Sequence, residues 1–280
     1  MAYSTGKIAV ITGAGSGMGR ALVQQLNREG CEVYFSDIKP DTLKETMDSL
    51  ERADVPAHPK VLDVADREAM HAWADEVAQA SGHIDIIVNN AGVALFSLVE
   101  DCDYDNLEWV MNINFWGVVH GTQAFLPLLR RSQQGHIVNT SSVFGLFSFP
   151  TQSAYNAAKF AVRGYTEALR HEMAGTSIHV CCVHPGGVRT NIAFDMRGGD
   201  PSQTAQERSD EFQRLTRTSP ESAAAQIIRA MEKRKKRLLI GWDAKIMDIV
   251  QRLFPVNYAR ILFLAVPKDA KALPEIRAKV

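Results

Sequence analysis

Tyr155 and Lys159 are the residues whose types and spacing most directly suggest chemistry. They lie four positions apart in a predicted helix and so share one face, where an ammonium group can stabilise a phenolate. An unperturbed tyrosine has a pKa of about 10, so proton exchange at neutral pH requires positive charge nearby. Pairs with this spacing are also common on helix surfaces, and the rest of the sequence must decide between the two interpretations.

A glycine-rich segment, Thr12–Gly19 (TGAGSGMG), joins a predicted strand at residues 7–13 to a predicted helix at residues 16–29. Backbone N–H groups and a helix N-terminus at such a junction favour a pyrophosphate. The spacing is Thr-Gly-X-X-X-Gly-X-Gly and differs from the strict dinucleotide fingerprint. Glycine turns without a ligand are common, but the position after the first strand favours a dinucleotide site.

Asp37 ends the second predicted strand, residues 31–37. A carboxylate there can accept hydrogen bonds from the adenosine ribose hydroxyls. It would also repel a 2′-phosphate by about 4 kcal/mol per unit charge at ~4 Å. NAD is therefore predicted over NADP, and Lys39 is the nearby cation that would have to reverse this preference. Without the glycine turn, a solvated strand-end carboxylate would be the better interpretation.

The elements that must position these residues alternate along the chain. Further strands are predicted at residues 59–64, 84–89, 136–141, 178–184 and 238–241, and helices at about 41–52, 66–80, 103–131, 153–174 and 220–233. Strands that alternate with helices imply a parallel sheet. The predicted fold is an α/β single-domain, doubly wound parallel sheet, Rossmann-like, with helices on both faces and a C-terminal helical extension.

Residues 1–241 are predicted to form the dinucleotide-binding and catalytic domain, and residues 242–280 a helical extension of the same domain. Residues 190–218 are polar and show no convincing strand, so we interpret them as a substrate lid. In the extension, residues 242–266 place apolar side chains at helical spacing. That apolar face is expected to pack over the pocket or against another subunit, with peripheral membrane contact as the alternative.

The composition indicates a globular protein with almost no net charge. Of 280 residues, 46% are hydrophobic and 22% charged, which excludes a disordered or coiled-coil chain. A net charge of -1 gives no general attraction for nucleic acid. The basic run Lys233–Arg237 contains no aromatic residues and is interpreted as a solvated helix end.

Targeting and redox features favour the cytoplasm. Only residues 1–6 precede the first apolar segment, so no secretory signal is predicted. No apolar run reaches about 18 residues, so no transmembrane segment is predicted either. The four cysteines are too few for a disulfide scaffold and are predicted to be reduced thiols.

With these motifs in order, the sequence resembles the short-chain dehydrogenase/reductase family from Lys7 to about Gly241. The matching segments are Thr12–Gly19, Asp63-Val64, Asn89-Asn90-Ala91-Gly92, Asn114, Ser142, the Tyr155-Asn156-Ala157-Ala158-Lys159 run and Pro185-Gly186. Turns and surface positions could explain one or two of these segments, but the whole ordered set favours the family.

The resemblance implies catalytic roles for four residues. Tyr155 would be the general acid/base, and Ser142 would hydrogen-bond the reacting oxygen. Lys159 would bind the nicotinamide ribose and lower the pKa of Tyr155, while Asn114 would hold a water in a proton relay. The implied NAD-binding set is Gly13, Ser16, Gly17, Met18, Gly19, Asp37, Asp63, Val64, Asn90, Ala91, Gly92, Tyr155, Lys159, Pro185, Val188 and Thr190.

In this family the segment after Ser142 borders the substrate, and here residues 143–150 contain no cation. Together with Phe194 from the predicted lid, they suggest a hydrophobic pocket. The alternative, that these aromatic residues pack in the core or at a subunit interface, carries nearly equal weight. The predicted substrate contacts are Ser142, Phe144, Phe149, Tyr155 and Phe194.

The sequence therefore predicts an NAD-dependent oxidoreductase for a hydrophobic secondary alcohol or ketone, with no metal. The resemblance also implies that the protein forms a homodimer or homotetramer. Alternatives are an NADP-dependent carbonyl reductase, which requires Lys39 or Arg20 to outweigh Asp37, and a catalytically silent dinucleotide-binding relative. Four intact catalytic residues disfavour the silent relative, because such a protein need not keep them all.

Overall fold

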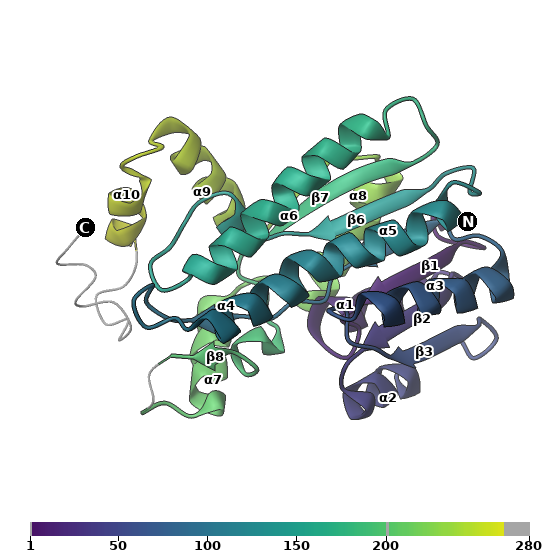
Figure 1. Cartoon of the computed structure of the whole chain (residues 1–280), viewed down its shortest axis with the longest axis horizontal. Helices are drawn as coiled ribbons and strands as arrows, with labels where there is room; N and C mark the ends of the chain where they lie inside the picture. The colour runs from purple at the N-terminus through teal and green to yellow at the C-terminus, as the bar shows by residue number, and fades with distance from the viewer. Residues whose placement is uncertain (1, 200–201, 266–280) are drawn as a thin grey trace.

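A computed structural model describes residues 2–199 and 202–265 of the chain (Figure 1). Its centre is a seven-stranded parallel sheet in the order β3-β2-β1-β4-β6-β7-β9. This arrangement confirms the predicted doubly wound sheet. The strands are β1 (Ile8–Thr12), β2 (Glu32–Asp37), β3 (Ala57–Val61), β4 (Ile86–Asn89), β6 (His136–Thr140), β7 (His179–Pro185) and β9 (Arg237–Ile240).

The two faces of the sheet bury separate cores because side chains of successive strand residues alternate. In β1, Ala9 and Ile11 join the core under α1 (Gly17–Arg28) and α8 (Pro220–Glu232). Val10 faces the opposite core, which includes residues of α3 (Arg67–Ser81), α5 (Gly117–Leu129) and α6 (Ser153–Glu172). Figure 1 shows α3, α5 and α6 in front of the sheet. Coverage on both faces explains why β1 reads as a continuous apolar run.

The strand order changes direction between β1 and β4, because β3 lies beyond β2 on one side and β4 starts the other side. In open α/β sheets, ligands bind in the crevice outside the carboxyl ends of the strands at this switch point. Here the carboxyl ends of β1, β2, β4, β6 and β7 carry the residues singled out by the motifs.

Two predicted segments differ from expectation. The predicted helix at residues 103–131 consists of α4 (Tyr104–Met111), a π-helical turn η1 (Asn112–Trp116) and α5. The predicted lid contains a 3-10 turn η3 (Asn191–Ala193), a short strand β8 (Arg197–Gly198) and helix α7 (Ala205–Leu215), where only a polar loop was expected. β8 pairs with β5 (Leu95–Phe96) in a separate two-stranded sheet. Helix α2 (Pro40–Asp48) connects β2 to β3.

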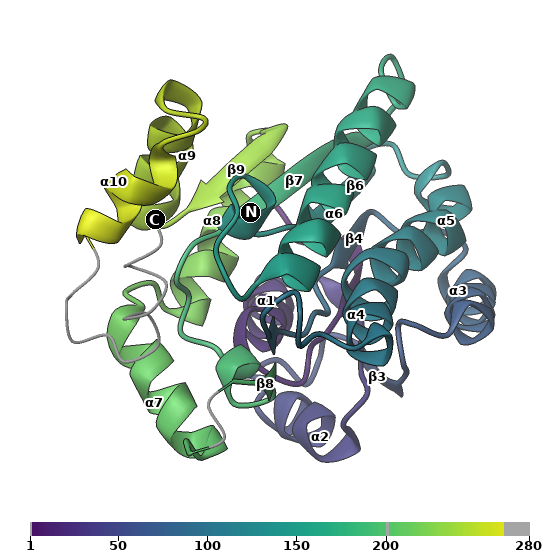
Figure 2. The ribbon, with the colours of Figure 1, turned by 60° about the vertical axis from the view of Figure 1, so that its left-hand side comes forward.

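The C-terminal extension forms α9 (Trp242–Leu253) and α10 (Tyr258–Ala265), which follow the edge strand β9 (Figure 2). Ala244 is fully buried and packs with Val143 and Phe147 next to the 3-10 turn η2 (Val143–Gly145). The predicted helical character is confirmed for these residues, while residues 266–280 lie outside the described part of the chain. None of the described helices is both long enough and apolar enough to cross a membrane.

Candidate active site

The glycine-rich segment forms a tight cradle at the carboxyl end of β1. Gly13 has φ +66°, a conformation that L side chains rarely adopt, and an added Cβ would lie 2.6 Å from the Cα of Ala91. An added Cβ at Gly17 would lie 2.8 Å from Thr190 Cγ2, and one at Gly19 would overlap the Gly13 carbonyl oxygen. The glycines thus let the backbone of Ala91 and the side chain of Thr190 come close to the main chain at the start of α1.

Asn90 and Ala91 fasten the end of β4 to this cradle. Thr12 Oγ1 accepts hydrogen bonds from the backbone N–H groups of Asn90 (3.0 Å) and Ala91 (3.2 Å). Asn90 Nδ2 donates to the carbonyl oxygens of Thr12 and Gly13, both at 3.2 Å. The structure therefore brings these predicted cofactor residues together at the switch point.

Asp37 lies beside Gly15, at the edge of the same cradle. Its Oδ2 accepts a hydrogen bond from Gly15 N at 2.8 Å, and its Oδ1 accepts one from Lys39 N at 3.0 Å. Ser16 precedes α1 with an extended backbone and makes no side-chain capping bond, so its hydroxyl does not satisfy the first N–H groups of the helix. A helix N-terminus beside a cradle without side chains fits a dinucleotide pyrophosphate.

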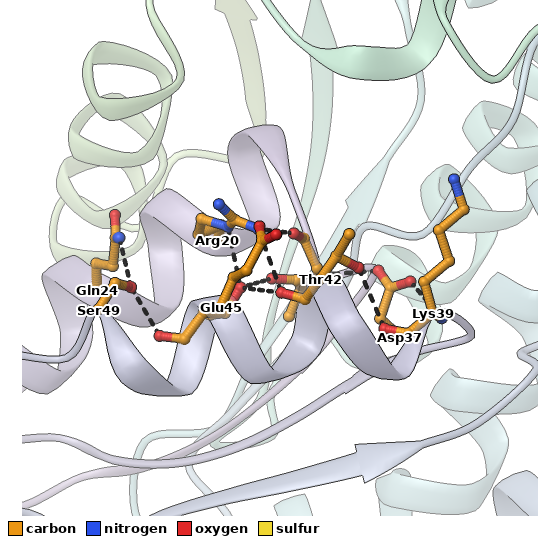
Figure 3. A network of polar contacts seen from close by, with 10 residues as sticks. Arg20, Gln24, Asp37, Lys39, Thr42, Glu45 and Ser49 are labelled. Atoms are coloured by element: carbon orange, nitrogen blue, oxygen red, sulfur yellow. Dashed lines mark hydrogen bonds and ion pairs between the residues drawn. The ribbon is translucent and has the colours of Figure 1, made fainter.

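The cations around Asp37 have other partners. Lys39 Nζ pairs with Asp195 of the lid at 2.5 Å, and Figure 3 shows its side chain extending away from the Asp37 carboxylate. Arg20 pairs with Glu45 at 2.7 Å, and its Nε donates to Thr46 Oγ1 at 3.0 Å. Neither cation makes an ion pair with Asp37 among the residues that the structure describes.

The predicted adenine contacts follow β3. Asp63 Oδ1 accepts a hydrogen bond from Ala65 N at 2.9 Å, which turns the chain toward α3. Val64 is buried, and an added Cβ on Gly117 would lie 2.8 Å from Val64 Cγ2. Met18 is half-buried and packs against the core under α1 and α8.

Asn114 lies in the π-helical turn η1 and is fully buried. Its Oδ1 accepts from Val93 N at 2.8 Å, and its Nδ2 donates to Val93 O at 2.9 Å. An added Cβ on Gly92 would lie 3.0 Å from Asn114 Oδ1 and 3.4 Å from Lys159 Nζ. Gly92 thus lies beside two predicted catalytic groups, and a side chain there would crowd both. Single π-helical turns often occur at functional sites.

Ser142, Tyr155 and Lys159 meet where β6 ends and α6 begins. Ser142 Oγ accepts a hydrogen bond from Phe144 N at 3.1 Å. Lys159 Nζ lies 5.7 Å from the centre of the Tyr155 ring and donates to the Thr140 carbonyl oxygen at 3.0 Å. Lys159 and Tyr155 are both buried.

Burial controls the protonation of this pair. It raises the pKa of Tyr155, and a hydrogen bond with Ser142 opposes that rise. Burial also lowers the pKa of Lys159 to about 8, because an ammonium group loses its hydration there. Burial therefore favours the protonated form of Tyr155.

His184 is a neighbour of the site that sequence reasoning missed. It is fully buried in β7, and its Nδ1 lies 3.0 Å from the carbonyl oxygen of Ser142. Burial lowers the pKa of His184 to about 4, so the neutral ring donates this hydrogen bond. A lone histidine in a buried strand carries no sequence signal for this role.

Phe144 connects the predicted substrate residues. Its ring stacks on Phe149 with centres 5.9 Å apart and meets Tyr155 edge-on at 6.1 Å. The carboxyl end of β7 forms another wall: Pro185 ends the strand, and buried Val188 bridges to Thr218. Phe194 lies in the lid and is 45% exposed, and the described structure gives it no ring contact with the other aromatic residues.

Two residues of the extension, Asp243 and Tyr258, also contact these walls and had no sequence signal. Asp243 Oδ2 accepts a hydrogen bond from Gly187 N at 2.5 Å, beside Pro185. The Tyr258 hydroxyl lies 3.1 Å from both the nitrogen and the carbonyl oxygen of Ser148. The Tyr258 ring meets Phe147 with centres 5.9 Å apart. The extension therefore supports the segment that carries Phe144 and Phe149.

Sequence comparisons agree with this arrangement. A family model described as short chain dehydrogenase matches residues 7–199. An oxidoreductase named SadH from Mycobacterium tuberculosis is 43% identical over 272 residues, which cover 96% of this chain and 98% of that protein. Dehydrogenase/reductase SDR family member 7B of Xenopus tropicalis is 32% identical over 277 residues, covering 96% of this chain and 89% of that protein.

Solved structures match over nearly the whole chain. A short-chain dehydrogenase/reductase from Burkholderia phymatum in complex with NAD has a TM-score of 0.80 at 29% identity, covering 96% of this chain and 99% of that one. A short chain dehydrogenase from Mycobacterium paratuberculosis bound to NAD has a TM-score of 0.74 at 28% identity, covering 86% and 98%.

Proposed function

The chain belongs to the short-chain dehydrogenase/reductase family, and from that premise we propose that it is an NAD-dependent oxidoreductase for a hydrophobic secondary alcohol or ketone. The observation that carries this proposal is the meeting of Ser142, Tyr155 and Lys159 beside the glycine cradle. The predicted proton-transfer groups and the glycine cradle thus lie near the carboxyl ends of β6 and β1, which flank β4 in the sheet.

The cofactor would be held by residues that the crevice already orders. The cradle and the start of α1 would hold the pyrophosphate, Asp37 the adenosine ribose, and Lys159 the nicotinamide ribose. The predicted contacts from Asp63, Val64, Pro185, Val188 and Thr190 complete this set. When bound, NAD supplies the group that accepts or donates the hydride.

Tyr155 exchanges the proton of the substrate oxygen, and Ser142 holds that oxygen by a hydrogen bond. Because burial raises the pKa of Tyr155, its hydroxyl is protonated before ketone reduction and can act as the acid. Alcohol oxidation requires the phenolate, which an ammonium form of Lys159 would stabilise. The pKa of Lys159, about 8, allows that charged form at neutral pH.

The surroundings of Gly92 support a route for returning the proton. Lys159 Nζ and Asn114 Oδ1 both lie beside Gly92, and the buried amide of Asn114 is held by two bonds to the backbone of Val93. A water between Lys159 and Asn114 would bridge ammonium and amide. Asn114 would thus position the relay.

Two contacts support NAD over NADP. Asp37 points into the cradle, where a 2′-phosphate would meet its charge. Lys39 and Arg20, the two cations that an NADP enzyme would need, are paired with Asp195 and Glu45. The NADP-dependent alternative would have to break at least one of these ion pairs.

The pocket wall supports an uncharged, hydrophobic substrate. Phe144 faces the ring of Tyr155, and Phe149 stacks behind Phe144, so an apolar group beside the reacting oxygen would be well packed. Residues 190–218 are proposed to close over this pocket, with Phe194 as a contact from the lid. A homodimer or homotetramer and a cytoplasmic location stay predictions.

A substrate and cofactor screen tests the proposal. Purified protein is assayed with NAD and NADP against aliphatic, steroid, retinoid and sugar alcohols, with nicotinamide absorbance as the readout. We expect NAD-dependent turnover of hydrophobic secondary alcohols. Tyr155→Phe should lower kcat by roughly 10²- to 10⁴-fold and leave NAD affinity unchanged, because it removes only the transferable proton.

Tyr104→Phe is the matched control, since Tyr104 is 82% exposed and lies outside the site. Near-normal turnover by Tyr155→Phe would remove that residue from the mechanism. A wild type that binds NAD but oxidises none of the alcohols would favour the silent relative.

A further inference from the structure

The outer face of α9 carries a continuous row of large apolar side chains. At 3.6 residues per turn, four of them fall within about 60° of the helix circumference. Isolated exposed apolar residues are ordinary, but a contiguous row marks a binding surface. We name this row the α9 ridge; its members, with their exposed fractions, are Trp242 (77%), Ile246 (54%), Ile249 (56%) and Leu253 (68%).

The apolar surface continues past the end of the helix, where Phe254 is 48% and Val256 is 85% exposed. Figure 2 shows α9 and α10 at one end of the molecule, beyond the edge strand β9. The opposite face of α9 is already occupied, because Ala244 and Met247 pack with the segment after Ser142. The ridge is therefore a second apolar face, distinct from the one that supports the pocket.

The acidic and basic side chains of α9 differ in their surroundings. Both of its acidic residues are engaged within the protein: Asp243 accepts from Gly187 N, and Asp248 is only 8% exposed and pairs with Arg237 and Arg252. Lys245 lies on the exposed side, with its Nζ 5.0 Å from the centre of the Trp242 ring. The ridge thus has cations beside it and no outward acid from its own helix.

A basic hollow of about 390 Å³ adjoins the ridge between α8, β9 and α9. Arg229, Lys235, Arg237 and Lys245 line it, and no acidic residue does. Arg237 is neutralised by Asp248, whereas the other three cations have no ion pair within the described part of the chain. Lys245 lines the hollow and contacts the ring of Trp242 in the ridge, so the hollow and the ridge adjoin each other.

Charge and apolar area together decide which partner fits. A second copy of this chain, pairing through this face, would offer the hollow no acidic residue. A nucleic acid would satisfy the cations and leave the ridge in water. A membrane with anionic lipids satisfies both, since lipid phosphates meet the cations while apolar side chains enter the acyl boundary. Tryptophan suits that boundary, because it is apolar with a polar N–H.

We propose that the α9 ridge and the basic hollow dock the protein onto the surface of membranes that contain anionic lipids. The helix would lie in the interface plane with Trp242 and Ile249 facing the lipid. The docking does not depend on the proposed reaction, because neither feature contains a residue of the candidate active site.

Vesicle sedimentation with the full-length protein tests this. We expect binding to vesicles of equal parts phosphatidylcholine and phosphatidylglycerol, little binding to phosphatidylcholine alone, and weakening by salt. Lys245→Gln should weaken binding about fivefold, the equivalent of ~1 kcal/mol for one cation near the surface. The double variant Ile246→Ser, Ile249→Ser should weaken it roughly tenfold or more.

Two control variants change the same kinds of residue elsewhere. Leu215→Ser removes a 63% exposed leucine from the end of α7, and Arg130→Gln removes an exposed cation that follows α5. Both should bind vesicles like the wild type, and thermal midpoints verify that every variant is folded.

Three results would overturn the docking surface. The first is no binding to the anionic vesicles, and the second is equal weakening by the controls. The third is a double variant that keeps vesicle binding but has a smaller assembly mass by light scattering, which would assign the ridge to a second copy of the chain.

Discussion

At the cofactor end of the site, the close contacts depend on the bare backbone of glycines, whereas at the substrate end they depend on aromatic side chains. Gly13 approaches Ala91, and Gly19 approaches the carbonyl of Gly13, more closely than any Cβ would permit. Across the crevice, Phe144 stacks on Phe149, and Tyr258 holds the main chain of Ser148. One end depends on missing side chains and the other on present ones.

This difference explains why the sequence predicts the cofactor end of the site better than the substrate end. Only glycine allows such close backbone approach, so the cradle leaves a fixed pattern of glycines in the sequence. An aromatic wall can be built from several residue types and positions, provided that total volume is kept. We therefore expect a single substitution at the cofactor end to cause a large loss of NAD affinity. A single substitution at the substrate end should cause a smaller change in KM for the substrate.

Gly19→Ala should have the largest effect of the substitutions that test this difference. The new Cβ would overlap the Gly13 carbonyl oxygen, and relief of such crowding costs about 1–3 kcal/mol. NAD affinity, measured by calorimetry, should fall roughly ten- to hundredfold. Gly164→Ala is the control, because an added Cβ there meets nothing within 4 Å inside α6 and should stabilise the fold by about 0.5–1 kcal/mol. Equal effects of the two variants would contradict a cradle closed to side chains.

Lowering the pH should decrease the stability of the fold through two buried histidines in the central sheet. His184 in β7 and His136 in β6 are buried, and burial lowers their pKa values from 6.5 to about 4 and about 3. As pH falls through this range, the unfolded chain binds protons that the native chain does not, so stability decreases. The free energy of unfolding should fall by up to about 1.4 kcal/mol per pH unit for each histidine.

Denaturant titrations between pH 6.5 and about 4.5 measure that slope. His136→Asn should make the decrease in unfolding free energy per pH unit smaller by the contribution of one proton. A wild-type slope that is flat over this range would contradict the neutral burial of both histidines.

Tyr258→Phe tests whether the extension shapes the substrate end. The variant keeps the ring beside Phe147 but loses both hydrogen bonds to Ser148, each worth about 0.5–1.5 kcal/mol. KM for hydrophobic alcohols should rise roughly five- to tenfold, with kcat and NAD affinity unchanged. The exposed Tyr104→Phe serves as the control. If the KM for NAD rose as much as that for the alcohol, Tyr258 would be a general stabiliser of the fold.

The smallest effect concerns the ion pair across the cofactor end. Asp195→Asn should release Lys39 toward a 2′-phosphate and raise kcat/KM with NADP by roughly two- to fivefold, in line with the worth of an exposed pair. Asp41→Asn removes a charge two residues from Lys39 without touching the pair. If both variants raised NADP use equally, the general field and not the ion pair would set the preference.

Sequence reasoning predicted the doubly wound parallel sheet from the alternation of strands and helices, and it singled out Ser142, Tyr155 and Lys159 from motifs at strand and helix ends. It missed α7, whose residues are polar on nearly every face and of which only Ser209 is buried. It also missed His184 and Tyr258, because their partners Ser142 and Ser148 lie far away in the chain. Tyr258 and Ser148 are separated by 110 positions, a pairing that no local pattern encodes.

The link between Tyr258 and Ser148 has a consequence for building chimaeras from related enzymes. Exchanging the loop of residues 143–150 alone would leave Tyr258 facing a main chain of different shape, and exchanging the terminal helices alone would leave Ser148 without its distant partner. The two segments form one transplantable unit despite their separation in the gene. Recombination libraries that keep both from the same parent should yield more folded, selective progeny than libraries that divide them.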